Sequence, residues 1–176
     1  MNLLNQTTAS IEKLNEEKMA KTKKRLDNLT KPPGSLGHLE KLAVKLTGIT
    51  GKVFAEVDQK AHIVMAADHG VVEEGVSAFP QEVTSQMVYN FLNNGAAVNV
   101  LAKQVGAEVT IVDIGVAQEL KADNLIIKKI NSGTNNIAKG PAMTKDEAIA
   151  SLEAGITVTD DLINKGAKLI GTGEMG

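Results

Sequence analysis

The stretch AHIVMAADHGVVEEGVSAFPQEVTSQMVYNFLNNGAA, residues 61–97, decides the fold. Residues 61–67 are apolar except for His62, and a short apolar run of this kind is typical of a parallel strand buried on both faces. The polar segment Asp68-His69-Gly70 follows directly. Because ligands of open α/β sheets bind beyond the carboxyl ends of the strands, this segment is a candidate site. After an acidic loop, a helix is predicted with Pro80 in its first turn and a stop at Asn94-Gly95.

The sequence that follows continues to alternate between helix and strand patterns. A helix is predicted over residues 96–104, a strand over 108–114 and a weaker strand over 125–130. Thr144 and Glu147 match a capping box, which opens a helix that ends at Gly166, and residues 167–170 form the next predicted strand. This alternation predicts an α/β fold for residues 53–176, with a parallel, Rossmann-like sheet and flanking helices.

Residues 1–52 show only helical periodicity. Ser10 is the expected N-cap of a first helix that ends at the turn of residues 31–34, and Ser35 is the expected N-cap of a second helix with an apolar stripe from Leu36 to Ile49. We predict a helical hairpin that belongs to a smaller helical domain. From the residues alone, the Pro-Pro-Gly turn between its helices is predicted to be a rigid connector that fixes the angle between them.

Composition narrows the class of protein. The 176 residues include 19 basic and 21 acidic side chains, a net charge of −2, so nucleic acid is not an expected partner. The Lys-rich segment 18–25 is interpreted as the solvated face of an amphipathic helix. Cysteine is absent, which excludes disulfides and thiolate chemistry. Neither a secretory signal nor a membrane-spanning stretch is evident, so a cytoplasmic protein is expected.

The polar residues after the first predicted strand leave several roles open. Asp68 and His69 fit a general base pair, metal ligands, or a structural loop. Metal binding needs three or four converging ligands, and Asp68, His69, Glu73, Glu74 and Asp113 lack a specific ligand spacing, so neither metal nor cofactor is expected. A metal-assisted phosphohydrolase that uses Asp68, His69 and Asp113 is one alternative function, and a non-catalytic nucleotide-binding module is another. The turn-forming segment 131–136 is either a surface loop or a substrate loop.

The last six residues, GTGEMG, are predicted to leave a strand as a glycine-rich loop. Backbone N–H groups of such a loop can approach a phosphate, so Gly173 and Gly176 are candidates for nucleotide binding, with Glu174 between them. A loop of this kind normally leads into a helix. We therefore expect the chain to be the N-terminal part of a longer protein.

Short motifs in a fixed order resemble one family. DHGV at residues 68–71, EGVS at 74–77, PQEVT at 80–84 and GAA at 95–97 closely resemble the nicotinate-nucleotide:dimethylbenzimidazole phosphoribosyltransferases. The resemblance continues through KPPGSLG at 31–37, VDIG at 112–115, NNIA at 135–138, GPAM at 140–143 and GEMG at 173–176. It covers essentially the whole chain, and several ordered blocks are more specific than any one motif. The resemblance also raises the alternative that the Pro-Pro-Gly turn borders the active site.

The resemblance implies a reaction and an assembly. It implies transfer of ribose 5-phosphate from nicotinate mononucleotide to 5,6-dimethylbenzimidazole in cobalamin biosynthesis, with inversion at the anomeric carbon, by a homodimer. The family's general base is a glutamate near the end of the full-length chain, and no residue of this sequence corresponds to it. Glu174 matches a separate, supporting active-site glutamate. The 176 residues alone are therefore expected to be inactive.

The reaction requires a dry slot for an apolar bicyclic base. We assign this slot to one loop residue, Phe79, and to two residues of the following helix, Gln86 and Met87. The same loop carries Asp68, His69 and Ser77, to which we assign no role.

Overall fold

The computed structural model describes residues 2–176, which pack as two compact units. One unit comprises residues 5–57 and the other comprises residues 58–176 together with 2–4. The first helix, α1, spans Leu3–Ala9. All four strands lie in the second unit. The assignment of the hairpin to a smaller helical domain stays a prediction.

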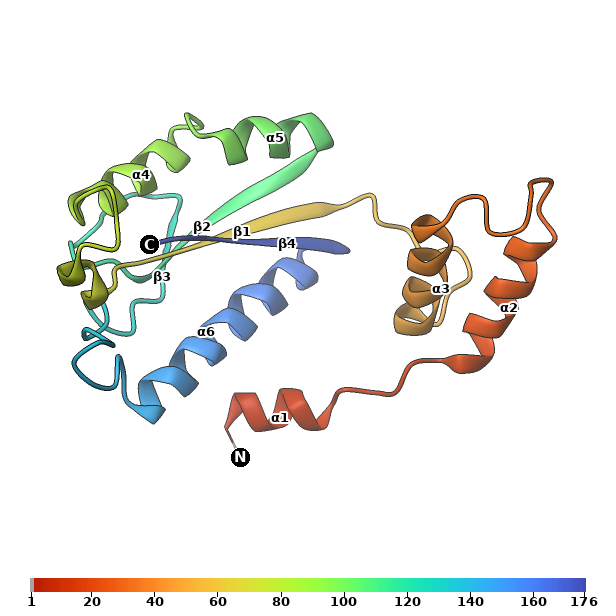
Figure 1. Ribbon diagram of the computed structural model, residues 1–176, viewed down its shortest axis with the longest axis horizontal. Coiled ribbons are helices and arrows are strands. Elements are labelled where there is room, and N and C mark those ends of the chain that lie inside the picture. The colour runs from red at the N-terminus through yellow and green to blue at the C-terminus, as the bar shows by residue number, and fades with distance from the viewer. Residues whose placement is uncertain (1) are drawn as a thin grey trace. The chain divides into compact units, whose positions relative to one another are not determined.

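The second unit is built on a parallel sheet (Figure 1). Its strands are β1 (Lys60–Ala67), β2 (Ala107–Gly115), β3 (Leu125–Ile127) and β4 (Leu169–Met175), in the order β3-β2-β1-β4. Every neighbouring pair is parallel. Parallel strands need long crossovers, and here helices supply those between β1 and β2 and between β3 and β4. The α/β fold predicted from the sequence is confirmed.

Helices cover both faces of this sheet, as Figure 1 shows. The helices α4 (Glu82–Leu92) and α5 (Ala97–Val105) cover one face, and α6 (Lys145–Asn164) covers the other. Successive residues of a strand point to opposite faces, so β1 contributes to two cores. Val64 and Ala66 pack with Val88 and Phe91 of α4, whereas Ala61 and Ile63 pack with Val158 and Leu162 of α6.

The boundaries of α6 agree with the sequence pattern. The Thr144 hydroxyl accepts a hydrogen bond from the Glu147 N–H (3.2 Å), and a Glu147 carboxylate oxygen accepts one from the Thr144 N–H (2.7 Å). This reciprocal pair is the predicted capping box. Gly166 follows the helix with φ +105°, a left-handed conformation that favours glycine.

The predicted glycine-rich loop at residues 171–176 is wrong, because β4 continues through Met175. Gly171 and Gly173 are two residues apart and therefore face the same side of β4. The imidazole of His62, on the paired strand β1, lies against both of them, so that a Cβ on Gly171 would stand 2.5 Å from Nδ1 and one on Gly173 would stand 2.8 Å from Nε2. The glycines thus make room for a histidine within a strand, which the sequence pattern did not indicate.

Smaller corrections concern other element ends. The helix α4 begins at Glu82, so Pro80 precedes it. Strand β3 ends at Ile127 instead of residue 130. In the first unit, α2 (Glu16–Asp27) is capped by Asn15, whose side chain accepts from the Lys18 N–H (3.0 Å), and not by Ser10. The helix α3 (His38–Thr50) follows Gly37, with φ +53°, and not Ser35.

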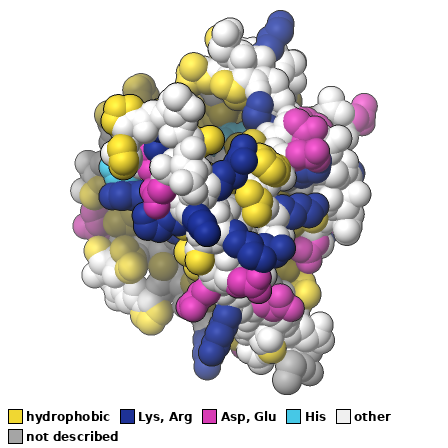
Figure 2. Space-filling model, turned by 90° about the vertical axis from the view of Figure 1, so that its right-hand side faces the viewer, with side chains coloured by type: hydrophobic (Ala, Val, Ile, Leu, Met, Phe, Trp, Pro, Cys, Tyr) yellow, Lys and Arg dark blue, Asp and Glu magenta, His cyan; other side chains and the backbone are white. Residues whose placement is uncertain are grey.

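The hairpin of α2 and α3 is held by close contacts between small and polar residues. The buried hydroxyls of Thr22 and Thr47 are hydrogen-bonded at 3.0 Å, and Met19 lies directly against Gly48. Figure 2 shows Lys and Arg side chains interspersed with acidic and apolar ones. The Lys-rich segment includes the ion pairs Lys21–Glu17 (2.6 Å) and Lys23–Asp27 (3.1 Å), which fits a solvated helix face. Among residues 2–176, no helix has both the length and the apolar character needed to cross a membrane.

Candidate functional site

The candidate site lies where β1 and β4 end. After β1, the chain forms a short 3₁₀ helix, η1 (Gly70–Glu74), which ends at Gly75 in a left-handed conformation with φ +71°. Residues 76–81 then lead to α4. Because parallel strands direct their carboxyl ends to one edge, this loop and the end of β4 lie together.

These segments enclose a cavity of about 370 Å³, which we call the Phe79 cavity. Most of its lining is apolar, which suits an aromatic ligand. Its lining residues include Val72, Val76, Phe79, Val83 and Met175, with Asp68, His69, Ser77, Thr84 and Gly176 as polar or small neighbours. The structure thus brings together five residues that the sequence singled out: Asp68, His69, Ser77, Phe79 and Gly176.

The three residues assigned to the base slot lie in different surroundings. Gln86 is exposed on α4 and does not line the Phe79 cavity. Met87 is partly buried against the core beneath α4. Phe79 lines the cavity with 68% of its surface exposed, and the assignment of the three residues to the base stays a prediction.

The nucleotide candidates at the end of β4 are also separated. Glu174 is exposed in register with Met65 of β1, and Gly173 lies against His62. Gly176 lies beside His69, because a Cβ at Gly176 would stand 2.8 Å from the imidazole Nε2. Of these three residues, Gly176 is the one that lines the Phe79 cavity.

Asp68 has a structural position. It is 3% exposed, and its carboxylate accepts a hydrogen bond from the Ala117 N–H at 2.7 Å. Its own N–H donates to the Gly115 carbonyl (2.9 Å), and its carbonyl accepts from the Thr134 N–H (3.0 Å). These bonds join the end of β1 to the segment after β2 and support the structural role among those left open. His69, the other member of the pair, is exposed and lines the Phe79 cavity.

Asp113 is engaged in the same way. It is fully buried, and its Oδ1 accepts from the N–H groups of Gly115 (3.1 Å) and Val116 (2.8 Å). Its Oδ2 lies 3.4 Å from the ammonium of Lys129. Asp113 therefore stabilises the turn after β2 and is not oriented as the phosphohydrolase alternative requires. Within residues 2–176, no three His, Asp or Glu side chains form a group that could hold a metal ion.

The segment 131–143 contributes to the site more than its sequence indicated. It lines a second, smaller cavity of about 180 Å³ together with Asp68 and His69, and we call this the Met143 cavity. Thr134 forms an isolated parallel bridge with His69, beyond the last β1–β2 pair. Beyond the end of β2, this segment lies beside the continuation of β1. Its position at the strand ends supports the interpretation of residues 131–136 as a substrate loop.

Gly70 lies where this segment crosses the loop after β1. Its N–H donates to the Thr134 carbonyl at 3.0 Å. A Cβ at this position would stand 2.6 Å from the Asn136 nitrogen and 2.7 Å from the Thr134 oxygen, both of which are backbone atoms. Close backbone approach is the reason for glycine here.

Side chains also join the two segments. The Asn136 amide donates to Glu74 (2.7 Å) and lies 3.4 Å from Glu73, and the Lys139 ammonium pairs with Glu73. The bond to Lys139, and then the bond to Asn136, lower the pKa of Glu73 below its ordinary value. Sequence spacing gives no signal for this set, because more than 60 residues separate its halves.

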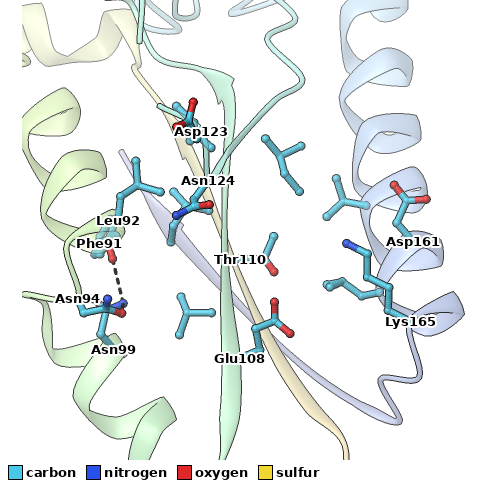
Figure 3. Close-up of a pocket in the computed structure, with 16 residues that line it drawn as sticks. Phe91, Leu92, Asn94, Asn99, Glu108, Thr110, Asp123, Asn124, Asp161 and Lys165 are labelled. Atoms are coloured by element: carbon cyan, nitrogen blue, oxygen red, sulfur yellow. Dashed lines mark hydrogen bonds between the residues drawn. The ribbon is translucent and has the colours of Figure 1, made fainter. Parts of the chain in front are cut away.

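A different cavity lies beside the first half of β2, and the carboxyl ends of β1 and β4 do not line it (Figure 3). Strand β3 pairs only with Ile111–Asp113, which leaves residues 108–110 of β2 with an open edge. Figure 3 shows Leu92 and Asn99 on one side of β2, and Asp161 and Lys165 of α6 on the other. This β2-edge cavity measures about 420 Å³ and is lined in part by core residues such as Phe91, Val158 and Leu162.

Comparison with known proteins identifies the family of this chain. The sequence model of a family described as "Phosphoribosyltransferase" matches residues 11–176. The chain belongs to this phosphoribosyltransferase family. Its Rossmann-like sheet is therefore that of a family member.

Individual relatives carry a more specific name. The nicotinate-nucleotide–dimethylbenzimidazole phosphoribosyltransferase of Acetivibrio thermocellus is 51% identical over 99% of this chain and 50% of its own length. That of Geobacter sulfurreducens is 51% identical over 100% of this chain and 50% of its own length. The crystal structure of CobT from Thermus thermophilus superimposes with a TM-score of 0.87 and 48% identity, over 91% of this chain and 48% of that one. The chain spans about half the length of the curated relatives it matches.

Proposed function

We propose that the protein transfers the ribose 5-phosphate of nicotinate mononucleotide to 5,6-dimethylbenzimidazole, which releases nicotinate and gives α-ribazole 5′-phosphate for cobalamin biosynthesis. The observation that carries the proposal is the 51% identity to phosphoribosyltransferases of that name along essentially the whole chain. The proposal includes the homodimer and the cytoplasmic location expected from the sequence, and nucleic acid is not among the expected partners.

The Phe79 cavity is the place we assign to the acceptor base. Its volume of about 370 Å³ is within the range of small-molecule sites, and its apolar lining excludes water from a bicyclic aromatic ring. Phe79 and Val76 are each 68% exposed, and no core packing accounts for this exposure. A ligand bound in the Phe79 cavity would cover both side chains, which accounts for two exposed apolar residues in the lining of one cavity.

The nucleotide is assigned to the end of β4, beside the same cavity. Gly176 lines the cavity next to His69, so a ribose phosphate there would place its anomeric carbon near the base. In the transfer, a nitrogen of the base attacks the anomeric carbon while the bond to nicotinate breaks, and the configuration inverts. The proton of the attacking base passes to a carboxylate that the family resemblance places outside these 176 residues. Glu174 keeps its supporting assignment.

The test is a product assay on the protein at its native length. With nicotinate mononucleotide and dimethylbenzimidazole together, we expect release of nicotinate that depends on the base, and formation of the α-nucleotide. Release of inorganic phosphate in place of nicotinate would identify a phosphohydrolase. Binding of the mononucleotide without any nicotinate release would identify a non-catalytic nucleotide-binding module, and either result would refute the proposal.

A second arm of the assay uses the 176 residues alone. The Acetivibrio and Geobacter relatives are each about twice as long as this chain, and the family resemblance implies that the general base lies in the half that this chain does not match. Loss of a positioned general base lowers rates by about 10²–10⁴. We therefore expect at least that loss for the 176-residue polypeptide, and recovery on addition of the unmatched half of the Acetivibrio relative. Full turnover by the polypeptide alone would contradict this placement of the base.

A further inference from the structure

The outer wall of the Phe79 cavity, residues 76–80, is held mainly through its two ends. Residues 76–80 make local hydrogen bonds, since the Phe79 N–H donates to the Ser77 hydroxyl (3.2 Å) and the Pro80 carbonyl accepts from the Val83 N–H (3.1 Å). Val76 and Phe79 are largely exposed. The position of this wall therefore depends on η1, which precedes it, and on α4, which follows it.

η1 is held in turn by the segment 134–139, through a set of side chains that we call the clamp: Asn136, Lys139, Glu73 and Glu74. Asn136 is its buried member, 8% exposed. The Asn136 side chain uses both ends, because Oδ1 accepts from the Ala138 N–H (3.0 Å) while Nδ2 donates to Glu74 (2.7 Å) and approaches Glu73 (3.4 Å). Lys139 closes the clamp on Glu73 from solvent.

The chemistry of the clamp requires an amide at residue 136. Two carboxylates face this position, so the group between them must donate, and a buried group that also accepts from a backbone N–H must be an acceptor at its other end. Asparagine meets both needs without adding charge. Charge-assisted hydrogen bonds of this kind are stronger than neutral ones, which suits a contact that fixes a loop.

We propose that Asn136 is a positioning residue for the acceptor base: it holds η1 so that Val76 and Phe79 form the wall of the Phe79 cavity. This inference rests on the proposed function and adds to it a residue that lies outside that cavity. It assigns to Asn136 a larger effect on the base than on the nucleotide, because the printed bonds of the clamp reach η1, whereas Gly176 follows β4.

The test measures KM for the base, KM for nicotinate mononucleotide and kcat in the native-length protein. Loss of the hydrogen bonds in Asn136→Ala is expected to raise KM for the base by about tenfold, with the nucleotide KM changed less than about twofold. Asn164→Ala is the matched control, because it removes the same amide from an exposed position outside the candidate site. Equal rises in both KM values, or an unchanged base KM, would overturn the proposal.

A donor–acceptor exchange separates positioning from simple destabilisation. Asn136→Asp places a third carboxylate in the clamp and is expected to raise the base KM at least as much as Asn136→Ala. Adding Glu74→Gln restores one hydrogen bond with its direction reversed, and should lower the base KM again by several-fold. No recovery in the double variant, with both variants folded, would refute the role of this contact.

The failure of the proposed function would be visible separately. If the unsubstituted protein transfers no phosphoribosyl group, the clamp is tested by amide hydrogen exchange. Asn136→Ala should then accelerate exchange at residues 76–79 relative to residues 88–91 of α4. Equal exchange at the two segments would overturn the positioning role whether or not the protein is a transferase.

Discussion

The Phe79 cavity and the β2-edge cavity are similar in volume, about 370 and 420 Å³, yet their walls differ in kind. The β2-edge cavity is formed by α4, α6 and β2, whose lining residues Phe91, Val158 and Leu162 are buried core members. Its buried amide, Asn99, is used within the protein, because it donates to the Phe91 carbonyl (3.0 Å) and accepts from the Ala96 N–H (3.2 Å). Packing and capping account for these side chains without a ligand.

The walls of the Phe79 cavity are loops with exposed apolar side chains, and its framework depends on contacts between distant segments. An exposed phenylalanine does little for the core. Volume alone would favour the β2-edge cavity, so the distinction between the two rests on what each lining residue does for the fold. If this distinction is valid, substitutions around the β2-edge cavity change stability, and substitutions around the Phe79 cavity change binding.

The largest expected effect comes from a matched pair of truncations. Leu162→Ala, at a residue 5% exposed, should lower the free energy of unfolding by about 2–5 kcal/mol and leave base affinity unchanged below the melting temperature. Phe79→Ala should lower stability by less than about 1 kcal/mol, since Phe79 is 68% exposed, but weaken base binding more than nucleotide binding. Denaturant titration and calorimetry measure the two quantities.

The opposite results would contradict the distinction between the two cavities. Equal loss of base and nucleotide affinity in Phe79→Ala would remove Phe79 from the base site. A loss of base affinity in folded Leu162→Ala would connect the β2-edge cavity to ligand binding.

A pair of glycine substitutions has the next largest effect. Gly70→Ala forces a Cβ to within 2.7 Å of backbone atoms of Asn136 and Thr134, which cannot move independently, so we expect a loss of about 1–3 kcal/mol and weaker base binding. Gly140→Ala is the control in the same connecting segment, because a Cβ there meets nothing within 4 Å. Thermal unfolding of both variants checks the contrast, and equal melting temperatures would show that the crossing at Gly70 is not tight.

The sequence predicted the features of the molecule that depend on local order. Residues 61–67 are a short apolar run, residues 108–114 are rich in β-branched residues, and Thr144 and Glu147 are three residues apart, so strands, helices and caps followed from composition and spacing. The site loop followed from the position of Asp68 after a buried strand. Features that depend on distant partners were missed. Asn136 contacts Glu74 across 62 residues, and no local pattern links them.

The misassigned glycines show the same limit. Gly171 and Gly173 look like a phosphate loop when only their neighbours in the sequence are considered. Their size is needed because His62, on a strand more than 100 residues earlier, lies against them. The alternation of two glycines with Thr172 is compatible with a strand, but only the register with β1 distinguishes the two interpretations.

The smallest expected effect is a loss of stability in acid that is confined to the loops around the candidate site. The pKa of Glu147 is lowered below its ordinary 4.5 by the Thr144 backbone N–H, then by the Thr144 hydroxyl and Asn131, and the pKa of Glu73 is lowered by Lys139 and Asn136. A carboxyl whose pKa is lower in the folded protein stabilises it above the unfolded value. That stabilisation is lost as the pH falls below about 4.5 and through the folded pKa.

Both carboxylates are solvent-accessible, so the loss should be modest, and it should be local. As the pH falls from 5 toward 3, amide exchange should rise at residues 70–79 and 132–139 before it rises in α4 and α5, whose caps do not use these carboxylates. Glu147→Gln should flatten the dependence of melting temperature on pH in this range, whereas Glu108→Gln, on the exposed part of β2, is the control. If acid loosened the walls of the β2-edge cavity first, the division between a packed cavity and a loop-walled site would be wrong.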